Sequence, residues 1–180
     1  AILGIVLAVG AVSGANATII YNTPGTTNVT GPVLDNVIVD SSATTVNVGT
    51  GGIIRGVNDP SLGIFNAAAR TRHGTLHVTG NGRIIAARGQ QAINMTGSPS
   101  TVRLSDNALV VGDVVNEFTA PGINLHLEDS ARVNGNVRYA GYMSMQDNAR
   151  INGSIINPDN GSYTLDMFGG IVTGQVVMGG

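Results

Sequence analysis

Three aspartates stand at the same place in three similar phrases of the sequence, and their spacing comes nearest to a chemical site. Asp106, Asp129 and Asp147 each follow an alternating apolar segment and open a short turn. If the phrases stack, the carboxylates form a column that could bind calcium or act as a paired acid and base. The plainer interpretation is that each carboxylate accepts backbone hydrogen bonds in its own turn. We favour it because other phrases carry glycine or threonine there.

Histidines form a second set of candidate ligands. His73 and His77 are four residues apart, which would make a metal pair on a helix, but the stretch alternates like a strand. His77 aligns with His126 at an outward position, two phrases away. Side chains so far apart do not share one metal ion, so we expect solvated imidazoles.

Arginines repeat as well, at a position just after the turn. Arg83, Arg132 and Arg150 align and are expected to point outward. Arg132 and Arg150 fall near Glu128, Asp129 and Asp147, so surface ion pairs of low energy are the plain interpretation. Binding of acidic glycans is the alternative.

Other catalytic and binding patterns are absent from the sequence. The chain has no cysteine, which excludes disulfides, a thiolate nucleophile and cysteine-ligated zinc. It has no G-x-S-x-G, P-loop, H-E-x-x-H or dinucleotide fingerprint. With a net charge of −2 and no lysine, it has no basic patch for nucleic acid. We therefore expect no enzymatic activity, no cofactor and no metal. Glycosylation sequons occur at Asn16, Asn28, Asn94, Asn152 and Asn160, a number close to chance for this composition.

A phrase that recurs six times must position all these residues. Two copies read Leu125-His-Leu127-Glu-Asp-Ser-Ala-Arg-Val-Asn-Gly135 and Met143-Ser-Met145-Gln-Asp-Asn-Ala-Arg-Ile-Asn-Gly153. In the first five copies, the step from the second apolar residue to the closing Gly or Ala is always 8, and the last copy is one residue shorter. The spacing between copies varies. A constant phrase with variable inserts is typical of stacked rungs with loops on one side.

The letters of one phrase predict three short strands per turn. Alternation of period 2 points one side chain inward and the next outward, and the Gly, Asp and Asn residues that follow are turn formers. Stacking then places equivalent residues of successive copies on top of each other. The expected core columns are Val46, Leu76, Val102, Leu125, Met143 and Leu165, and beside them Val48, Val78, Leu104, Leu127, Met145 and Met167.

The expected architecture is all-β: a single right-handed parallel β-helix of about 6–8 rungs with an apolar N-terminal arm. Residues 1–17 are uncharged and end in Ala15-Asn16-Ala17, so they are the arm or a signal-peptide remnant. Residues 18–45 are lead-in strands, and 46–180 form the repetitive β-helix. We expect long loops at 57–74 and 87–100, with at most one helical turn within 57–72.

The phrase resembles the β-helical passenger domains of autotransporters of the pertactin and AIDA type. Leu127-Glu-Asp-Ser-Ala-Arg-Val-Asn-Gly135 and Pro32-Val-Leu-Asp-Asn-Val-Ile-Val39 carry the resemblance, which covers roughly residues 32–178. It implies a secreted, cell-surface protein. The chain is short for a passenger, so we expect either a fragment or a free-standing subunit.

Three functions follow from these observations. The first is an extracellular structural subunit that polymerises head to tail into a filament or coat, its partner being itself. The second is an adhesin-type passenger that binds host or cell-surface glycans or proteins, and the third is a glycan-degrading enzyme. For the first, the uncharged segments at the two ends would meet: Ile2, Leu3, Ile5, Val6, Leu7, Val9 and Val12 from the arm, and Val176, Val177 and Met178.

Overall fold

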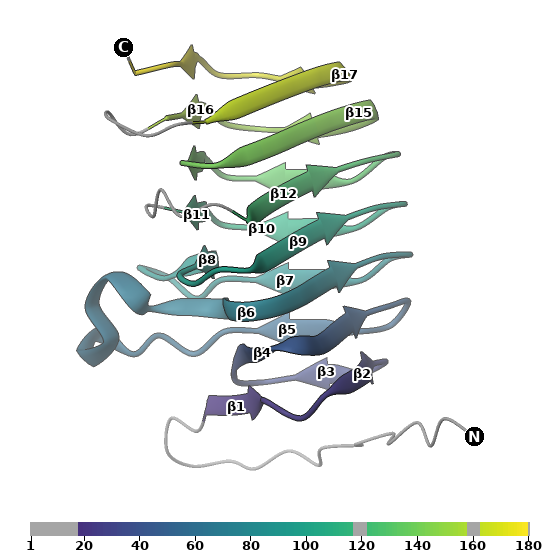
Figure 1. Cartoon of the computed structure of the whole chain (residues 1–180), viewed down its shortest axis with the longest axis vertical. Helices are drawn as coiled ribbons and strands as arrows, with labels where there is room; N and C mark the ends of the chain where they lie inside the picture. Colours follow the sequence, from purple (N-terminus) through teal and green to yellow (C-terminus); the bar gives the residue numbers. More distant parts are fainter. Residues whose placement is uncertain (1–17, 117–121, 158–162, 180) are drawn as a thin grey trace.

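The computed structural model describes residues 18–116, 122–157 and 163–179. Within them, eighteen strands join into one sheet in which every pairing is parallel. The strands stack as rungs from the N-terminal to the C-terminal end (Figure 1). The all-β parallel solenoid expected from the repeat is therefore confirmed.

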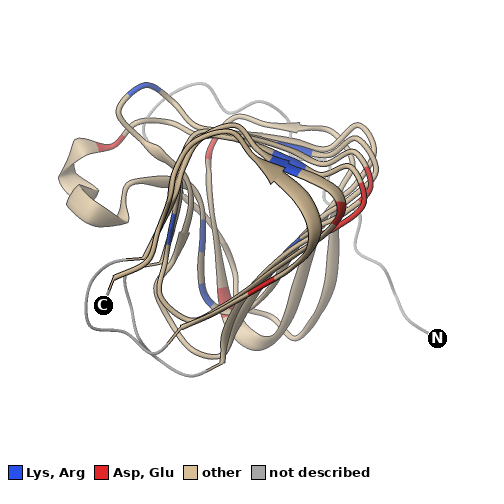
Figure 2. Ribbon diagram, turned by 90° about the horizontal axis from the view of Figure 1, so that it is seen from above, with Lys and Arg blue, Asp and Glu red and all other residues tan. Residues whose placement is uncertain are grey.

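Each rung has three faces, so the coil is triangular when seen along its axis (Figure 2). Face A holds β2 (Gly25–Val29), the second part of β4 (Asn36–Val48), the second part of β6 (Ala67–Val78), β9 (Ser100–Leu104), β12 (Ile123–Leu127), and the first parts of β15 (Tyr142–Ile151) and β17 (Thr164–Val172). Face B holds β3 (Pro32–Val33), β5 (Ile53–Arg55), β7 (Arg83–Ile85), β10 (Leu109–Val111), β13 (Arg132–Asn134), and the ends of β15 and β17. Face C holds β1 (Thr18–Tyr21), the first parts of β4 and β6, β8 (Gln91–Met95), β11 (Val114–Asn116), β14 (Val137–Tyr139), β16 (Ile155–Ile156) and β18 (Val176–Val177). Seven rungs, each with one segment on every face, follow β1.

The strand register stacks identical inward positions on top of each other. In the first expected column, Leu76 pairs with Val46 and Val102, and Leu125 pairs with Val102 and Met143. The second column runs in the same way from Val29 at the first rung to Met167 at the last. Members from Val46 to Met145 are buried, and together with the face B and face C columns they form one continuous core. No single rung could bury these side chains alone.

Two corners of the coil restrict the residue types that they can hold, one through the close approach of the rungs and the other through its backbone angles. A Cβ atom on Gly135 would lie 2.3 Å from the Gly112 carbonyl oxygen, and one on Gly153 would lie 2.2 Å from that of Gly135. At the corner between faces A and B, Asp106, Asp129 and Asp147 adopt positive φ angles of 56°, 56° and 58°. Aspartate is among the few residues that tolerate this left-handed conformation.

The loops are shorter than expected at both predicted places. The loop at 57–74 ends at Ala67, where β6 begins, and the loop at 87–100 is interrupted by β8. The run Ala67-Ala-Ala69 is not part of a helical turn but a buried strand that pairs with β4 and β8 on face C, where Ala69 lies opposite Val37 and Ile93. The one short helix among the described residues is a 3-10 segment, Pro60–Phe65, which projects from the rod (Figure 1).

The lead-in region pairs with the repeat itself. Within 18–45, β1 pairs with the first part of β4, and β2 pairs with its second part, Thr27 opposite Val46. These strands are thus the first layers of the same solenoid. The arm at 1–17 lies outside the described residues. No helix in the described part of the chain is long and apolar enough to span a membrane.

Candidate functional site

The C-terminal rung presents an apolar surface at one end of the rod. β17 pairs on one side with β15, and β18 pairs on one side with β16, so their other edges carry no strand among the described residues. Large apolar side chains are exposed along this rung: Met167, Phe168, Ile171, Val176, Val177 and Met178. The three C-terminal residues expected to take part in assembly belong to this set.

Comparison with the interior rungs shows why these side chains are exposed. Met167 continues the column of Leu127 and Met145, which are both fully buried, yet it is 44% exposed. Val176 likewise continues the column of Ile155 and is 45% exposed, against 3% for Ile155. The core columns are therefore open at this end, and a further rung would bury them. Leu165, in the other core column, is partly buried.

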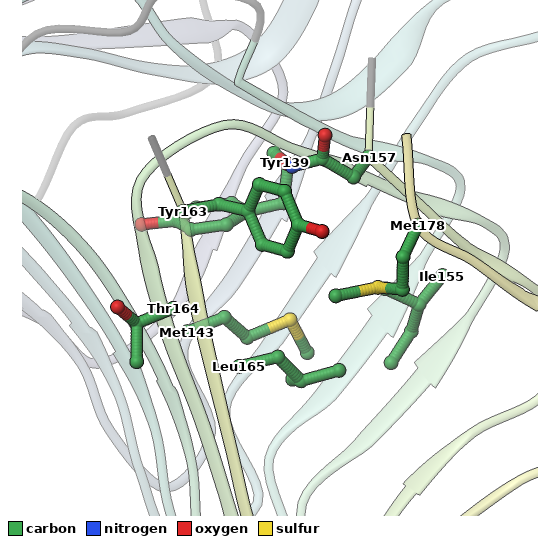
Figure 3. A pocket seen from close by; sticks show the side chains of 8 residues that line it. All are labelled: Tyr139, Met143, Ile155, Asn157, Tyr163, Thr164, Leu165 and Met178. Carbon is green, nitrogen blue, oxygen red and sulfur yellow. The ribbon is translucent and has the colours of Figure 1, made fainter. Parts of the chain in front are cut away.

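A small cavity lies next to this end, between β14, β16 and the last rung (Figure 3). Its lining is mostly apolar and includes Met143, Leu165 and Met178. Tyr139 donates its hydroxyl to the Ile123 carbonyl at 2.7 Å, and burial raises the pKa of this phenol. Asn157 donates Nδ2 to the Tyr139 carbonyl at 2.9 Å. These polar groups hold neighbouring rungs together, and no acid–base pair lines the cavity.

The aspartate column serves as a hydrogen-bond ladder. Asp106 Oδ2 accepts from the Gly80 amide at 2.9 Å and from the Thr79 hydroxyl at 2.5 Å. Asp129 Oδ2 accepts in turn from the Asp106 amide at 3.0 Å. The carboxylates thus bond to the rung before their own, whereas we expected bonds within their own turn. The reason is that the left-handed residue directs its amide along the axis, where the next carboxylate reaches it. Acidic residues stack visibly at one corner in Figure 2.

A second ladder, on the corner between faces B and C, escaped sequence analysis. Asp113 Oδ1 accepts from the Asn136 amide at 2.8 Å, and Asn136 Oδ1 accepts from the Ser154 amide at 3.0 Å. Ser154 Oγ accepts from the Gln175 amide at 3.1 Å. The signal was present in the sequence, because each ladder residue stands between a glycine and a β-branched residue.

The three histidines lie too far apart to share a ligand. His77 and His126 both flank Arg103 on face A and are therefore two rungs apart. They are half-buried and bonded to serine hydroxyls, so they are not the free solvated imidazoles that we expected: His77 Nε2 lies 2.9 Å from Ser105 Oγ, and His126 Nδ1 lies 2.8 Å from Ser144 Oγ. Burial lowers the pKa of both imidazoles. His73 Nδ1 contacts the Ser98 carbonyl at 3.0 Å.

Arg83, Arg132 and Arg150 align on face B through Leu109, as the repeat suggests. The expected ion pairs with the nearby acids do not form. Arg150 donates instead to Asn152 Oδ1 at 2.6 Å. The ion pairs among the described residues join Arg72 to Asp40, at 3.0 Å, and Arg103 to Glu128, at 2.6 Å.

The sequon asparagines among the described residues differ in their accessibility. Asn28 and Asn152 are exposed, Asn94 is buried and bonded to the Ile64 carbonyl, and Asn16 and Asn160 lie outside the described residues. Within the described ranges, no group of three or more His, Asp or Glu side chains is close enough to hold a metal ion.

No family model, curated protein or solved structure matches this chain.

Proposed function

We propose that this chain is a secreted, cell-surface structural subunit that stacks head to tail into an extracellular filament or coat. The observation that carries the proposal is the open core column at Met167. A first rung from a second copy, placed on the last rung, would continue that column with Val29. Val29 is only 5% exposed in the single chain, so the N-terminal end must open before the two ends join. The apolar surface that is exposed at this end would then be buried as it is between interior rungs.

The strands at the two ends are compatible with such a joint. β17 would receive β2 on face A and β3 on face B. On face C, which has one strand more than the other faces, β18 and β1 of the next copy would compete for the same level, so one of these two short strands must leave the sheet in the joint. In this register, four residues of each strand would face each other on face A: Thr26–Val29 would lie opposite Thr164–Met167. Parallel pairing on faces A and B would give the free backbone groups of β17 and β2 partners.

The charges at the two ends also allow the contact. Strands β1, β2 and β3 contain no charged residue, and β17 and β18 contain Asp166 alone. Natural sheets usually guard free edges with lysines, prolines or inward charges. In the joint, Asp166 would lie over Asn28, which adds no like charge.

The test is assembly of the full chain at increasing concentration, followed by sedimentation velocity and negative-stain electron microscopy. Met167→Asp places a carboxylate in the open column and should abolish stacking, whereas Arg132→Asp on face B should not. Thr27→Lys should block the opposite end. The two blocked variants keep complementary free ends, so a mixture should form 1:1 dimers and no filaments. A full chain that stays monomeric at high concentration would exclude this function.

The adhesin alternative is favoured by a different observation, the polar outward residues on face A. Monodisperse rods in the microscope would support it over the filament. The glycan-degrading alternative predicts turnover of acidic polysaccharides by the purified chain.

A further inference from the structure

Face A differs from the other two faces in its outward residues. Two outward columns on its seven rungs contain only polar residues, and Phe168, beyond them on the last rung, is an exposed apolar exception. The first outward column is Thr26, Thr45, Thr75, Thr101, Asn124, Tyr142 and Thr164, and the second is Asn28, Asn47, His77, Arg103, His126, Ser144 and Asp166. Face B, by contrast, places Ile53 and Leu109 outward, and face C places Ile156 outward. The strip therefore offers hydroxyl, amide and imidazole groups along the whole rod.

The polar strip is nearly uncharged. Arg103 is the single cation in the two columns, and its guanidinium pairs with Glu128 at 2.6 Å. Asp166 is the single anion within the columns. A nucleic acid or an acidic glycan would need an excess of cations here. The charge balance thus favours a neutral ligand.

An aromatic pair lies on the strip in the C-terminal half of the rod. The rings of His126 and Tyr142, on neighbouring rungs, have centroids 5.6 Å apart and are tilted by 55°. Ser144 holds His126 in place through its hydroxyl, at 2.8 Å. Interaction with the Asp166 carboxylate raises the pKa of the Tyr142 phenol. The pair is therefore fixed by its neighbours on both sides and offers its rings on a sheet of fixed geometry.

Rings held beside hydroxyl and amide groups suit a sugar. The C–H side of a pyranose packs on an aromatic ring, and its hydroxyls bond to neutral donors and acceptors. Tyrosine provides such contact area with little loss of side-chain freedom. Because the rungs repeat every ~4.8 Å, an extended polymer meets polar groups at regular steps.

We propose that face A, centred on Tyr142 and His126, binds a neutral linear polysaccharide that runs along the rod axis. The site lies on the side of the rod, at outward positions that a stacked second copy would not cover, so it does not depend on the proposed stacking. Binding is distributed over several rungs, each of which contributes weakly.

Affinity electrophoresis of the full chain tests the site, in gels that contain dextran, galactomannan or hydroxyethylcellulose, with alginate as the acidic comparison. Retardation by at least one neutral polymer is expected. Tyr142→Ala should raise the dissociation constant on the order of tenfold, as for an aromatic contact at a hot spot. Tyr142→Phe keeps the ring and should retain most of the affinity. Arg132→Ala, on face B, is the matched control and should bind like the parent chain.

Three results would overturn the proposal: no retardation by any of the neutral polymers, retardation by alginate alone, or equal retardation of the parent chain and Tyr142→Ala. Thermal unfolding of each variant separates loss of the site from loss of the fold. The Met167→Asp variant should be monomeric, and its dissociation constant for a short oligosaccharide should equal that of the parent monomer. A chain that fails to polymerise but binds a neutral polysaccharide would leave this inference standing.

Discussion

Truncation of one core column at different rungs measures how the stack distributes its stability. Leu127 is fully buried between Leu104 and Met145, which are also fully buried. Leu127→Ala leaves a cavity that cannot collapse, because the backbone ladders above and below fix the rung spacing. We expect a loss of about 2–5 kcal/mol in the free energy of unfolding. A typical domain has only about 5–15 kcal/mol in total.

Two further truncations provide the comparison. Met167 is in the same column but 44% exposed, so Met167→Ala removes much less buried surface and should cost roughly 1 kcal/mol or less in the monomer. His126 is the outward neighbour of Leu127. His126→Ala loses the Ser144 hydrogen bond and the contact with Tyr142, which together amount to about 1–2 kcal/mol.

Urea unfolding followed by circular dichroism gives all three values, at a protein concentration where sedimentation shows a monomer. Equal losses for Leu127→Ala and His126→Ala would show that the register is wrong by one residue, since such a slip exchanges inward and outward positions. A loss for Met167→Ala as large as that for Leu127→Ala would show that the last rung is covered in the monomer. The stacking proposal would then lose its main support.

Three other perturbations have outcomes that the geometry fixes. Gly135→Ala should destabilise the rod by about 1–3 kcal/mol, because the new Cβ would lie 2.3 Å from a carbonyl oxygen. Gly31→Ala is the control and should be neutral, because a Cβ there meets nothing within 4 Å. Equal melting temperatures for the two variants would contradict the close approach of the rungs at Gly135. Hydrogen bonds from Thr79 and Gly80 lower the pKa of Asp106 below 3.8, so its contribution to stability is present above that pH and is lost as the pH falls further. The melting temperature of Asp106→Asn should therefore fall less steeply in acid than that of the parent chain, and parallel curves would count against the ladder. Addition of a chelator should leave the melting temperature unchanged; a large drop would reveal a metal site in the aspartate column.

The fold could be predicted because the repeat carries two independent signals. Alternation of period 2, as in Leu125-His-Leu127, assigns inward and outward positions, and the constant step to the closing glycine fixes the corner. Stacking then forces equivalent residues into register, as Leu125 with Val102 and Met143 shows. Few side-chain details are needed for this inference, since any out-of-register pairing would expose the core residues.

The loops and the polar ladders could not be predicted in the same way. Ala67 to Ala69 have low strand propensity, so local sequence gives no hint that they form a buried strand. Their state depends on the neighbouring rungs, where Ala69 pairs with Val37 and Ile93. The direction of the Asp106 hydrogen bonds likewise depends on the rung before it, and a single phrase contains no information about its neighbour.

Only part of the candidate site could be predicted from the sequence. Val176 and Val177 could be identified from sequence, because an uncharged strand at the end of a solenoid has no obvious cap. Met167 was assigned to a core column, and its position in that column is as expected. Its exposure follows from its place in the last rung and not from its local sequence. The same holds for Tyr142 and His126, whose contact arises only when two rungs stack.

The two proposals together make a prediction that neither makes alone. If a second copy stacks on the last rung, Thr164 meets Thr26 and Asp166 meets Asn28, so both outward columns of face A continue across the joint. A filament would then present an uninterrupted polar strip, and a polysaccharide long enough to span several copies would bind with increased avidity. The parent chain should therefore be retained by long neutral polysaccharides more strongly than the monomeric Met167→Asp variant. Both proteins should bind short oligosaccharides equally, because these contact one copy only. Equal retention on long polymers, from a parent chain that does form filaments, would show that the joint interrupts the strip and that the stacking register is different.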